Sequence, residues 1–440
     1  MDQAWLAELS EWLAIPSISA DPAHADDVAR AGEWLCDRIR RAGGNAELAD
    51  WNGSPLALGE LPASEGADSA PTILCYGHFD VQPPDPLEGW DSPPFEATER
   101  DGWLYARGVA DDKGQLYLLL KAAEELAAAG ALPVNLRFAC DGEEETGGHS
   151  IVEFLADDER GADACVIFDT DMLARGRPAF NIATRGLCYY HVRVRTGSRD
   201  LHSGMYGGAA LNALHALVRV LSAVQARDGR LPEPLRAGLV PPTEEELAGW
   251  TSLPAGAGEL ADQGARPLDP RAAEEFYLRT WAEPAVDVNG IEGGSPQLQK
   301  TVLPALAEAN VSIRLAPGQD PDTIAPEFER LLREATPEGA ELEIELWARS
   351  APGLVDQQAP AIQLGLDAFE RALGVRPLLI RSGGTLPIVP ALADKGIPAI
   401  VTGFALSDSN IHSPNERLPT EHFALGVAAA RELFTELAKL

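Results

Sequence analysis

The sequence predicts an α/β fold, in which a larger domain with a mostly parallel sheet flanked by helices carries an inserted, smaller α+β domain. Apolar runs of strand length alternate with amphipathic helical runs at both ends of the chain, which is typical of a parallel sheet with helices on its faces. Between roughly residues 185 and 350 this alternation gives way to strands with one half-exposed face. With 440 residues, the chain is also too long for one ordinary core.

The elements of the larger domain follow from apolar spacing and from stop signals. Pro16 ends the first amphipathic helix, and Gly43-Gly44 ends the second. The expected helices lie near residues 3–14, 25–43, 114–129, 149–156, 360–373 and 420–438, and the expected strands near 72–77, 134–140, 164–168 and 398–402.

The inserted domain is expected to span residues 185–349, with 1–184 and 350–440 forming the larger domain. Leu187–Arg195 alternates apolar and polar residues imperfectly, as a half-exposed strand would. Residues 228–270 are rich in Pro, Gly and Glu and are expected to form a long irregular excursion. The other elements expected here are helices near 209–226 and 321–335 and strands near 309–315 and 341–347.

The charge balance excludes two classes of partner. The chain has 35 basic and 68 acidic residues, a formal net charge of −33. A surface this negative repels nucleic acid and anionic membranes, so neither is expected as a partner. The acidity is interpreted first as a source of solubility or as an adaptation to salt, and second as a means of attracting cations.

The five cysteines indicate a reducing compartment. Their number is odd and they show no paired C-x-x-C spacing. The N-terminal segment lacks a basic stretch and a long apolar core, so no signal peptide is evident. No run reaches the roughly 18 apolar residues of a membrane span. A cytoplasmic protein is therefore expected.

Five acidic or histidine residues follow apolar, strand-like runs of the larger domain. They are His78, Asp111, Glu145, Asp169 and His412. In open α/β sheets, ligands bind outside the carboxyl ends of the strands. Two histidines and three carboxylates at one such edge predict a hydrolytic centre with two metal ions.

Each of these signals also has a simpler interpretation when it is taken alone. Asp80, two residues after His78, is placed to orient that imidazole, although a satisfied loop histidine would look the same. Asp111 can instead be a helix N-cap. The run Glu143-Glu144-Glu145 can be a solvated loop, but its mutual repulsion favours cations nearby.

Together these motifs resemble the M20 metallopeptidases, and within that family the dipeptidases of the carnosine-dipeptidase type. The matching segments are Gly77–Gly114, Glu144-Glu145, Asp169, Asp200–Gly204, Asn289–Gly293, Lys300–Pro304, Arg381–Thr385 and His412. The resemblance implies a catalytic domain with an inserted lid and dimerisation domain. It further implies that His78 and Asp169 hold one divalent ion, that Glu145 and His412 hold the other, and that Asp111 bridges the two.

The same resemblance assigns roles outside the ligand set. Glu144 is expected to be the general base that takes a proton from a metal-bridging water and returns it to the leaving amine. His202 is expected to stabilise the oxyanion from the partner subunit of a homodimer, and Arg314 to bind the substrate carboxylate. Thr301 and the loop of Gly384 and Thr385 match further substrate contacts.

Departures from the family pattern affect the expected substrate, among them a less acidic loop, Leu406–Ile411, before His412. Thr385 stands where these dipeptidases usually carry Ser, and Ser382 where they often carry Glu. We expect hydrolysis of dipeptides or short peptides. The alternatives are an N-acyl amino acid deacylase or a carboxypeptidase of the same family and, more remotely, a binding protein that has lost catalysis. The ions are expected to be Zn²⁺, with Mn²⁺ or Co²⁺ also suited to these ligands.

Overall fold

The computed structural model describes all 440 residues and divides into two compact units. The larger unit comprises Met1–Ile182, Val355–Ile380 and Pro387–Leu440, and the smaller comprises Ala183–Leu354 and Arg381–Leu386. The last segment corrects the sequence analysis, which placed it in the larger domain. The reason lies in tertiary contacts, because Arg381 donates hydrogen bonds to Glu246 and to the carbonyl oxygen of Val240, which both belong to the smaller unit.

The larger unit carries most of the regular elements. Its helices are α1 (Gln3–Leu13), α2 (Ala25–Arg41), α3 (Lys113–Ala128), α4 (His149–Asp157), α10 (Pro360–Leu373), α11 (Ile388–Asp394) and α12 (Thr420–Leu437). Its main sheet consists of β1 (Asn45–Trp51), β2 (Ser54–Leu61), β3 (Thr72–Tyr76), β6 (Asn135–Asp141), β7 (Ala164–Phe168) and β16 (Ala399–Thr402). Smaller sheets are formed by β4 (Thr98–Arg100), β5 (Trp103–Tyr105) and β17 (Arg417–Pro419), and by β8 (Ala179–Ala183) and β15 (Leu378–Arg381).

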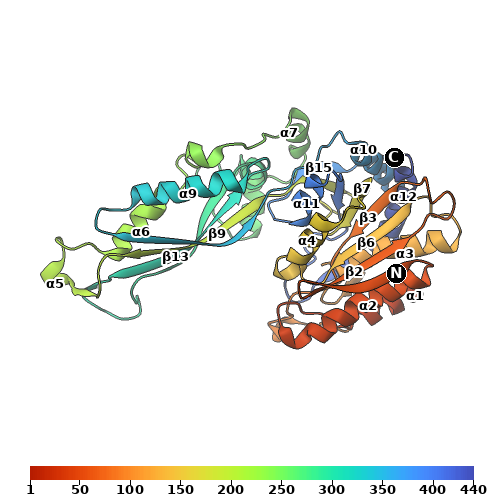
Figure 1. Cartoon of the computed structure of the whole chain (residues 1–440), viewed down its shortest axis with the longest axis horizontal. Coiled ribbons are helices and arrows are strands. Elements are labelled where there is room, and N and C mark those ends of the chain that lie inside the picture. Colours follow the sequence, from red (N-terminus) through yellow and green to blue (C-terminus); the bar gives the residue numbers. More distant parts are fainter. The chain divides into compact units, whose positions relative to one another are not determined.

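The main sheet confirms the predicted α/β class. Its strand order is β1-β2-β6-β3-β7-β16, and Figure 1 shows β2, β6, β3 and β7 side by side. The pairs β6–β3, β3–β7 and β7–β16 are parallel, whereas β2 is antiparallel to both of its neighbours. The β1–β2 hairpin was not predicted. It turns through Asn52 and Gly53, which both have positive φ, as a two-residue hairpin turn requires.

Helices cover both faces of this sheet. On one face α2, α3, α12 and α10 pack in a row, and on the other α4 packs against α11. Strand β1 separates the two layers, since its Leu48 meets Gly32 of α2 while its Trp51 packs edge-on against Phe154 of α4. A Cβ at position 32 would lie 2.4 Å from Leu48 Cδ1, so a larger residue there would have to displace the Leu48 side chain.

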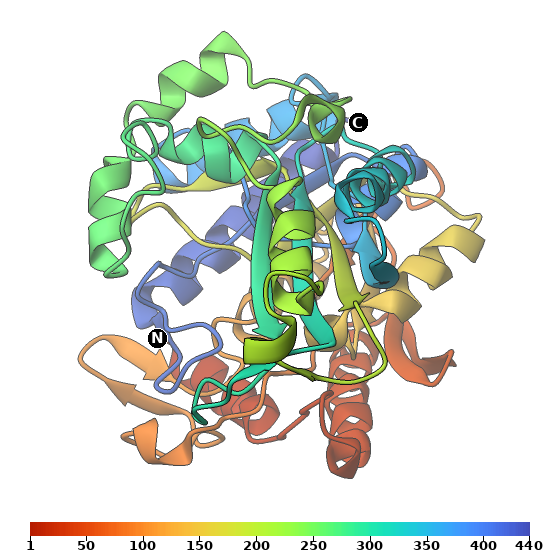
Figure 2. The same cartoon turned by 90° about the vertical axis from the view of Figure 1, so that its left-hand side faces the viewer.

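The smaller unit is an antiparallel sheet with helices on one face. Its sheet has the order β11-β13-β9-β14, formed by Ala285–Glu292, Leu306–Leu315, Gly186–Arg195 and Glu341–Ser350. The helices α6 (Ala213–Ser222) and α9 (Pro321–Ala335) pack against this sheet and against each other, and Figure 2 shows α6 in front of the strands. The remaining elements are β10 (Leu201–His202), α5 (Ser203–Tyr206), α7 (Glu244–Trp250), α8 (Gly256–Asp262) and β12 (Val302–Leu303).

Three expectations about local structure were wrong. Residues 228–270 are not wholly irregular, because they contain α7 and α8. The predicted helix 209–226 is shorter, since α6 begins only after the N-cap Asn212. Arg107–Ala110 is not a strand but a series of turns that leads into α3.

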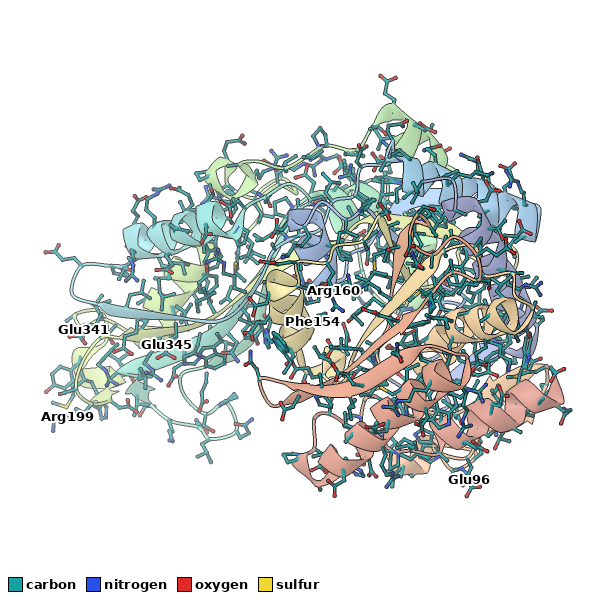
Figure 3. All side chains as sticks on the ribbon, turned by 45° about the vertical axis from the view of Figure 1, so that its right-hand side comes forward. Glu96, Phe154, Arg160, Arg199, Glu341 and Glu345 are labelled. Atoms are coloured by element: carbon teal, nitrogen blue, oxygen red, sulfur yellow. The ribbon has the colours of Figure 1, made fainter.

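The acidic residues lie largely at the surface. The side chains of Glu96, Glu341 and Glu345 are exposed, and all three are visible in Figure 3. No helix of the structure combines the length and the apolar character that crossing a bilayer requires.

Candidate metal centre

The five predicted residues come together at one edge of the main sheet. Asp169 directly follows β7, and His78 follows β3 after Gly77. Glu145 lies in a 3-10 turn after β6, and His412 lies in the loop after β16. These four strands are parallel neighbours, so their carboxyl ends meet at the same edge. Asp111 reaches the same place from the turns before α3.

The ligand atoms form two overlapping groups of three. His78, Asp111 and Asp169 make one group, and Asp111, Glu145 and His412 make the other, with the atoms of each group within 4.8 Å of one another. Asp111 belongs to both. Its Oδ1 lies 2.8 Å from His78 Nε2, and its Oδ2 lies 2.9 Å from His412 Nε2.

Local backbone geometry holds the two histidines in place. At position 77, before His78, a Cβ would lie 2.5 Å from Asp112 Oδ2, so only glycine allows this approach. The N–H of His78 donates to that same oxygen at 3.2 Å. Asp112 therefore anchors the His78 loop and makes no side-chain cap on α3. His412 has a φ of 60°, in the left-handed region that few residues other than glycine adopt.

Asp80 is fully buried and supports several residues of the site at once. Its Oδ1 lies 3.3 Å from His78 Nδ1, and its backbone oxygen lies 3.1 Å from the same nitrogen. Its carboxylate also accepts the N–H groups of Glu144 and Glu145, at 3.2 and 3.1 Å. Ser19 donates its hydroxyl to Asp80 at 2.6 Å. Asp80 thus fixes the backbone of both glutamates in addition to contacting His78.

Gln82 is a further contact that the sequence analysis missed. Its Nε2 donates to Glu145 Oε2 at 2.8 Å, which leaves the other oxygen of this carboxylate unengaged. Glu145 Oε1 is buried without a hydrogen-bond partner. A buried carboxylate oxygen that accepts no hydrogen bond is available as a ligand for a cation.

The electrostatics of the cluster show an excess of negative charge. Burial raises the pKa of Asp169 well above its usual range, and the charge of Asp111 adds to this rise although His78 opposes it. Hydrogen bonds to Asp111 and Glu145 raise the pKa of His412 to about 10. Burial alone would raise the pKa of Asp111, but hydrogen bonds with His412 and His78 lower it below its usual range.

This charge distribution and donor set fit two divalent ions. Asp111 lies within hydrogen-bond distance of both imidazoles, and the carboxylates around His78 and His412 raise the pKa of each. A metal ion that binds to such groups displaces their protons. Each group of three offers one imidazole nitrogen and two carboxylates, which suits Zn²⁺ and other divalent transition metals. Three protein ligands for each ion leave a coordination position open, as hydrolytic metal sites do.

Glu144 stands beside this cluster without belonging to either group of three. Burial raises the pKa of its carboxyl to about 7, and the charges of Asp111 and Glu145 contribute while His78 opposes them. A carboxylate with a pKa near neutrality can both accept and return a proton at physiological pH.

Three of the predicted substrate contacts meet inside the smaller unit. Arg314 Nη1 donates to Thr385 Oγ1 at 2.9 Å, and this hydroxyl donates to the backbone oxygen of Arg185 at 2.7 Å. The N–H of Arg185 donates to the oxygen of Gly384 at 2.9 Å. Arg185 was not predicted as part of this group, because it carries no motif signal beyond its place before Gly186.

The two guanidinium groups make this region electropositive. Burial, together with the charge of Arg314, lowers the pKa of Arg185 to about 10. Neither arginine forms an ion pair, although the charge of Asp287 opposes the lowering of the pKa of Arg185. In the whole chain, acidic residues outnumber basic ones almost two to one. An unpaired guanidinium is a ready partner for a carboxylate of another molecule.

His202 and Thr301 lie close to each other elsewhere in the smaller unit, on adjacent strand ends. His202 ends β10, which is paired with β12, and its side chain is exposed. The backbone oxygen of Thr301 accepts the N–H of Ser203 at 3.0 Å. The structure therefore brings the five predicted substrate residues together as two groups rather than as one.

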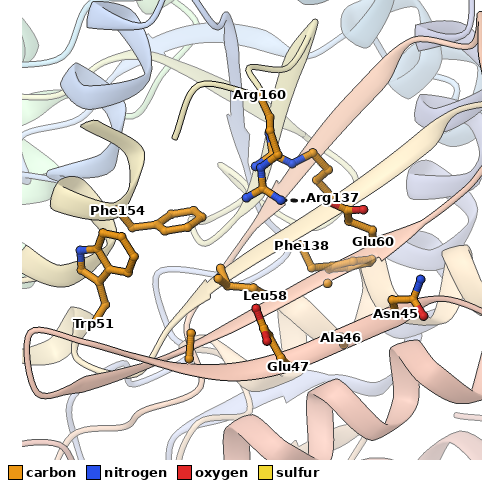
Figure 4. A pocket seen from close by; sticks show the side chains of 12 residues that line it. Asn45, Ala46, Glu47, Trp51, Leu58, Glu60, Arg137, Phe138, Phe154 and Arg160 are labelled. Atoms are coloured by element: carbon orange, nitrogen blue, oxygen red, sulfur yellow. Dashed lines mark hydrogen bonds and ion pairs between the residues drawn. The ribbon is translucent and has the colours of Figure 1, made fainter. Parts of the chain in front are cut away.

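A hollow in the larger unit shares no residue with the metal cluster. It measures about 420 Å³ and lies at β1, β2 and α4. Figure 4 shows its apolar floor at Leu58 and Phe138, with Phe154 and Arg160 above them. Arg160 is paired with Glu60 at 2.9 Å, so this guanidinium already has a carboxylate partner. The hollow holds no group of residues placed to bind a metal ion, whereas the cluster at the sheet edge holds two.

Comparison with known proteins gives a consistent result along almost the whole chain. The model described as peptidase family M20/M25/M40 matches residues 74–436. The chain is 28% identical to the Beta-Ala-His dipeptidase of Rattus norvegicus, over 98% of this chain and 92% of that protein. It is 29% identical to the Cysteinylglycine-S-conjugate dipeptidase of Corynebacterium striatum, over 97% of this chain and 94% of that protein.

A solved structure has the same arrangement of elements. The M20 family metallo-carboxypeptidase Sso-CP2 from Sulfolobus solfataricus matches with a TM-score of 0.87 and 26% identity, over 100% of both chains.

Proposed function

Because the chain belongs to peptidase family M20/M25/M40, we propose that it hydrolyses the peptide bond of dipeptides at a centre holding two divalent metal ions. The observation that carries this proposal is the sharing of Asp111 between two groups of ligands, with Glu144 beside them and outside both. The dipeptidase names of the similar proteins support the substrate class.

The ligands divide between the two ions as the geometry groups them. We assign His78 and Asp169 to one ion, Glu145 and His412 to the other, and Asp111 to both. Bound there, two divalent ions would polarise the scissile carbonyl and make the attacking water more acidic. Zn²⁺ suits the imidazole nitrogens best, and Mn²⁺ or Co²⁺ also suits the carboxylates.

Glu144 performs the proton transfers in this proposal. Its carboxylate accepts the proton of the attacking water and then returns it to the leaving amine. Asp80 keeps Glu144 in position through the backbone N–H that it accepts, and it orients the imidazole of His78. Glu144 retains its basicity because it is not among the ligands.

We assign the substrate carboxylate to Arg314, with Arg185 adding a second positive charge beside it. Thr385 and Gly384 hold this region together through their hydrogen bonds to Arg314 and Arg185. A guanidinium matches the two oxygens of a carboxylate in shape and charge.

Replacement of Arg314 by Met tests this assignment. The variant loses a charged hydrogen-bond donor worth about 1.5–3 kcal/mol, so KM for a dipeptide is expected to rise by roughly 10- to 100-fold with a smaller change in kcat. A dipeptide amide has no carboxylate, so wild type and variant should differ little on it. The exposed Arg333 of α9, replaced by Met, is the matched control. An equal loss on the amide and on the free acid would contradict the assignment.

The smaller unit is proposed to be a lid and dimerisation domain, in which His202 stabilises the oxyanion in the partner subunit and Thr301 contacts the substrate. Large apolar side chains exposed on this unit support a protein partner, among them Met205 at 74%, Val218 at 58% and Ile291 at 55% exposure. A cytoplasmic location is proposed on the ground that all five cysteines are free and buried.

A carboxypeptidase acting on longer peptides is the second candidate, favoured by the match to the metallo-carboxypeptidase Sso-CP2. It shares the ions, the base and the arginines, and differs only in the length of peptide that it accepts. An N-acyl amino acid deacylase would differ because its substrate has no free amine.

A substrate screen with the metal-reconstituted protein tests the proposed function. Dipeptides with a free amine and a free carboxylate are expected to be cleaved, with kcat/KM at least about tenfold above that for tetrapeptides, since one unmatched end costs about 1.4 kcal/mol or more. Preference for tetrapeptides would establish the carboxypeptidase instead. Cleavage of the N-acyl amino acids alone would establish the deacylase.

A further inference from the structure

A fully buried glutamate that is not among the proposed ligands touches the backbone of Asp111. Glu416 is 0% exposed and lies four residues after His412, directly before β17. Its charged partner Arg107 is 1% exposed, with Nη1 at 2.7 Å from Glu416 Oε2. A buried ion pair of this kind needs further hydrogen bonds to offset its desolvation.

Those hydrogen bonds come from the turns that carry Asp111. Glu416 Oε2 also accepts the N–H of Gly108 at 3.0 Å. Its Oε1 accepts the N–H groups of Ala110 and Asp111, at 2.8 and 3.1 Å. Each carboxylate oxygen thus takes two donors, and one side chain holds most of the backbone donors between Arg107 and Asp111.

The opposite side of the same turns is held by Gln115 of α3. Its Nε2 donates to the oxygen of Ala110 at 2.7 Å, and its Oε1 accepts the N–H of Phe404 at 2.6 Å. Both backbone groups of Ala110 are therefore occupied, one by Glu416 and the other by Gln115. Since Phe404 and Glu416 bracket the loop of His412, the two contacts join the Asp111 turns to that loop.

We propose that Glu416 is a positioning residue that fixes the backbone of Asp111, so that one oxygen of this carboxylate faces each group of metal ligands. This inference rests on the proposed two-metal centre. Asp111 is the one residue common to both groups, so a shift of its backbone moves a ligand of both ions. Glu416 therefore sets the affinity of the protein for both ions without touching either.

The substitution Glu416→Gln removes the charge and one acceptor oxygen of the carboxylate, while it keeps the volume of the side chain. An amide offers one acceptor oxygen and one donor nitrogen, whereas the structure requires two acceptors. The variant must lose either the donors Arg107 and Gly108 or the donors Ala110 and Asp111. Glu436→Gln is the matched control, because Glu436 of α12 is also buried, at 2% exposed, and is paired with Arg371 of α10.

Three measurements on folded protein test the proposal. In metal-free protein, amide hydrogen exchange at Ala110 and Asp111 is expected to speed up in Glu416→Gln and to stay unchanged in Glu436→Gln. In chelator competition, the affinity for both Zn²⁺ ions is expected to fall by about 10- to 100-fold, the usual cost of losing a partner that orients a ligand. The visible spectrum of the Co²⁺-loaded variant is expected to differ from that of wild type, which a general loss of stability would not cause.

Unchanged Zn²⁺ affinities and an unchanged Co²⁺ spectrum in Glu416→Gln would overturn the proposal, and so would weakening of one ion alone. If Glu416→Gln does not fold, Glu416→Asp replaces it, because this side chain keeps the charge for Arg107 but is about 1.5 Å too short to reach both donor pairs. The same exchange and affinity results are expected. If wild-type protein binds fewer than two Zn²⁺ ions, the proposed function is wrong. This result differs from those that would contradict the role of Glu416, so the two proposals are tested separately.

Discussion

Glu144→Gln is expected to lower kcat by about 10²- to 10⁴-fold, the usual contribution of a positioned acid–base group, while the protein keeps two metal ions. Glutamine has the shape of glutamate but cannot accept the proton of the attacking water. The metal ligands are untouched, because Glu144 belongs to neither group of three. Steady-state rates and metal content measured on the same sample check this prediction.

The neighbouring Glu143 provides the control for local folding. Its carboxylate accepts the N–H of Ser150 at the start of α4, at 2.7 Å, and lies outside the metal cluster. Glu143→Gln is therefore expected to keep both its ions and most of its rate. If Glu144→Gln lost an ion, or kept its full rate, Glu144 would not be the general base.

Asp111→Asn is expected to abolish activity and to weaken the binding of both metal ions by more than about 100-fold. This loss is larger than that expected for a residue that only orients a metal ligand, which is about 10- to 100-fold. The reason is that Asp111 belongs to both groups of ligands, since one of its oxygens lies 2.8 Å from His78 Nε2 and the other lies 2.9 Å from His412 Nε2. An amide has no negative charge and only one acceptor oxygen, so it cannot serve two cations. Metal titration of chelator-treated protein measures the effect.

Two other variants show whether the loss is specific. His412→Ala removes a ligand from one group only, so a single ion should be weakened. Asp101→Asn is a control in the same unit, at a position with a φ of 52° that asparagine tolerates as well as aspartate. A loss of one ion alone in Asp111→Asn would show that Asp111 does not bridge.

The regular elements could be predicted where local signals are strong. Helices α9 and α10 begin at Pro321 and Pro360, because proline at the first helical position is favourable and apolar spacing continues from there. The edge strand β11 was missed, since its residues 285–292 are mostly exposed and carry little apolar pattern. The β1–β2 hairpin was missed although Asn52-Gly53 is a strong turn signal.

The candidate ligands could be predicted because four of them lie in the segments that follow strands recognisable in the sequence. The residues that hold them could not, since their partners are distant along the chain. Glu416 and Arg107 are 309 positions apart, and Gln82 and Glu145 are 63 apart. Arg185 likewise comes close to Arg314 only through the register of β9 against β13, which no local pattern reveals.

Anomalous diffraction from crystals of the Zn²⁺-loaded protein tests the two-metal centre most directly. Two peaks are predicted, each within about 2.0–2.2 Å of a different oxygen of Asp111 and of one histidine nitrogen. One peak would belong to His78 and the other to His412. A single peak, or two peaks of which only one contacts Asp111, would contradict the account.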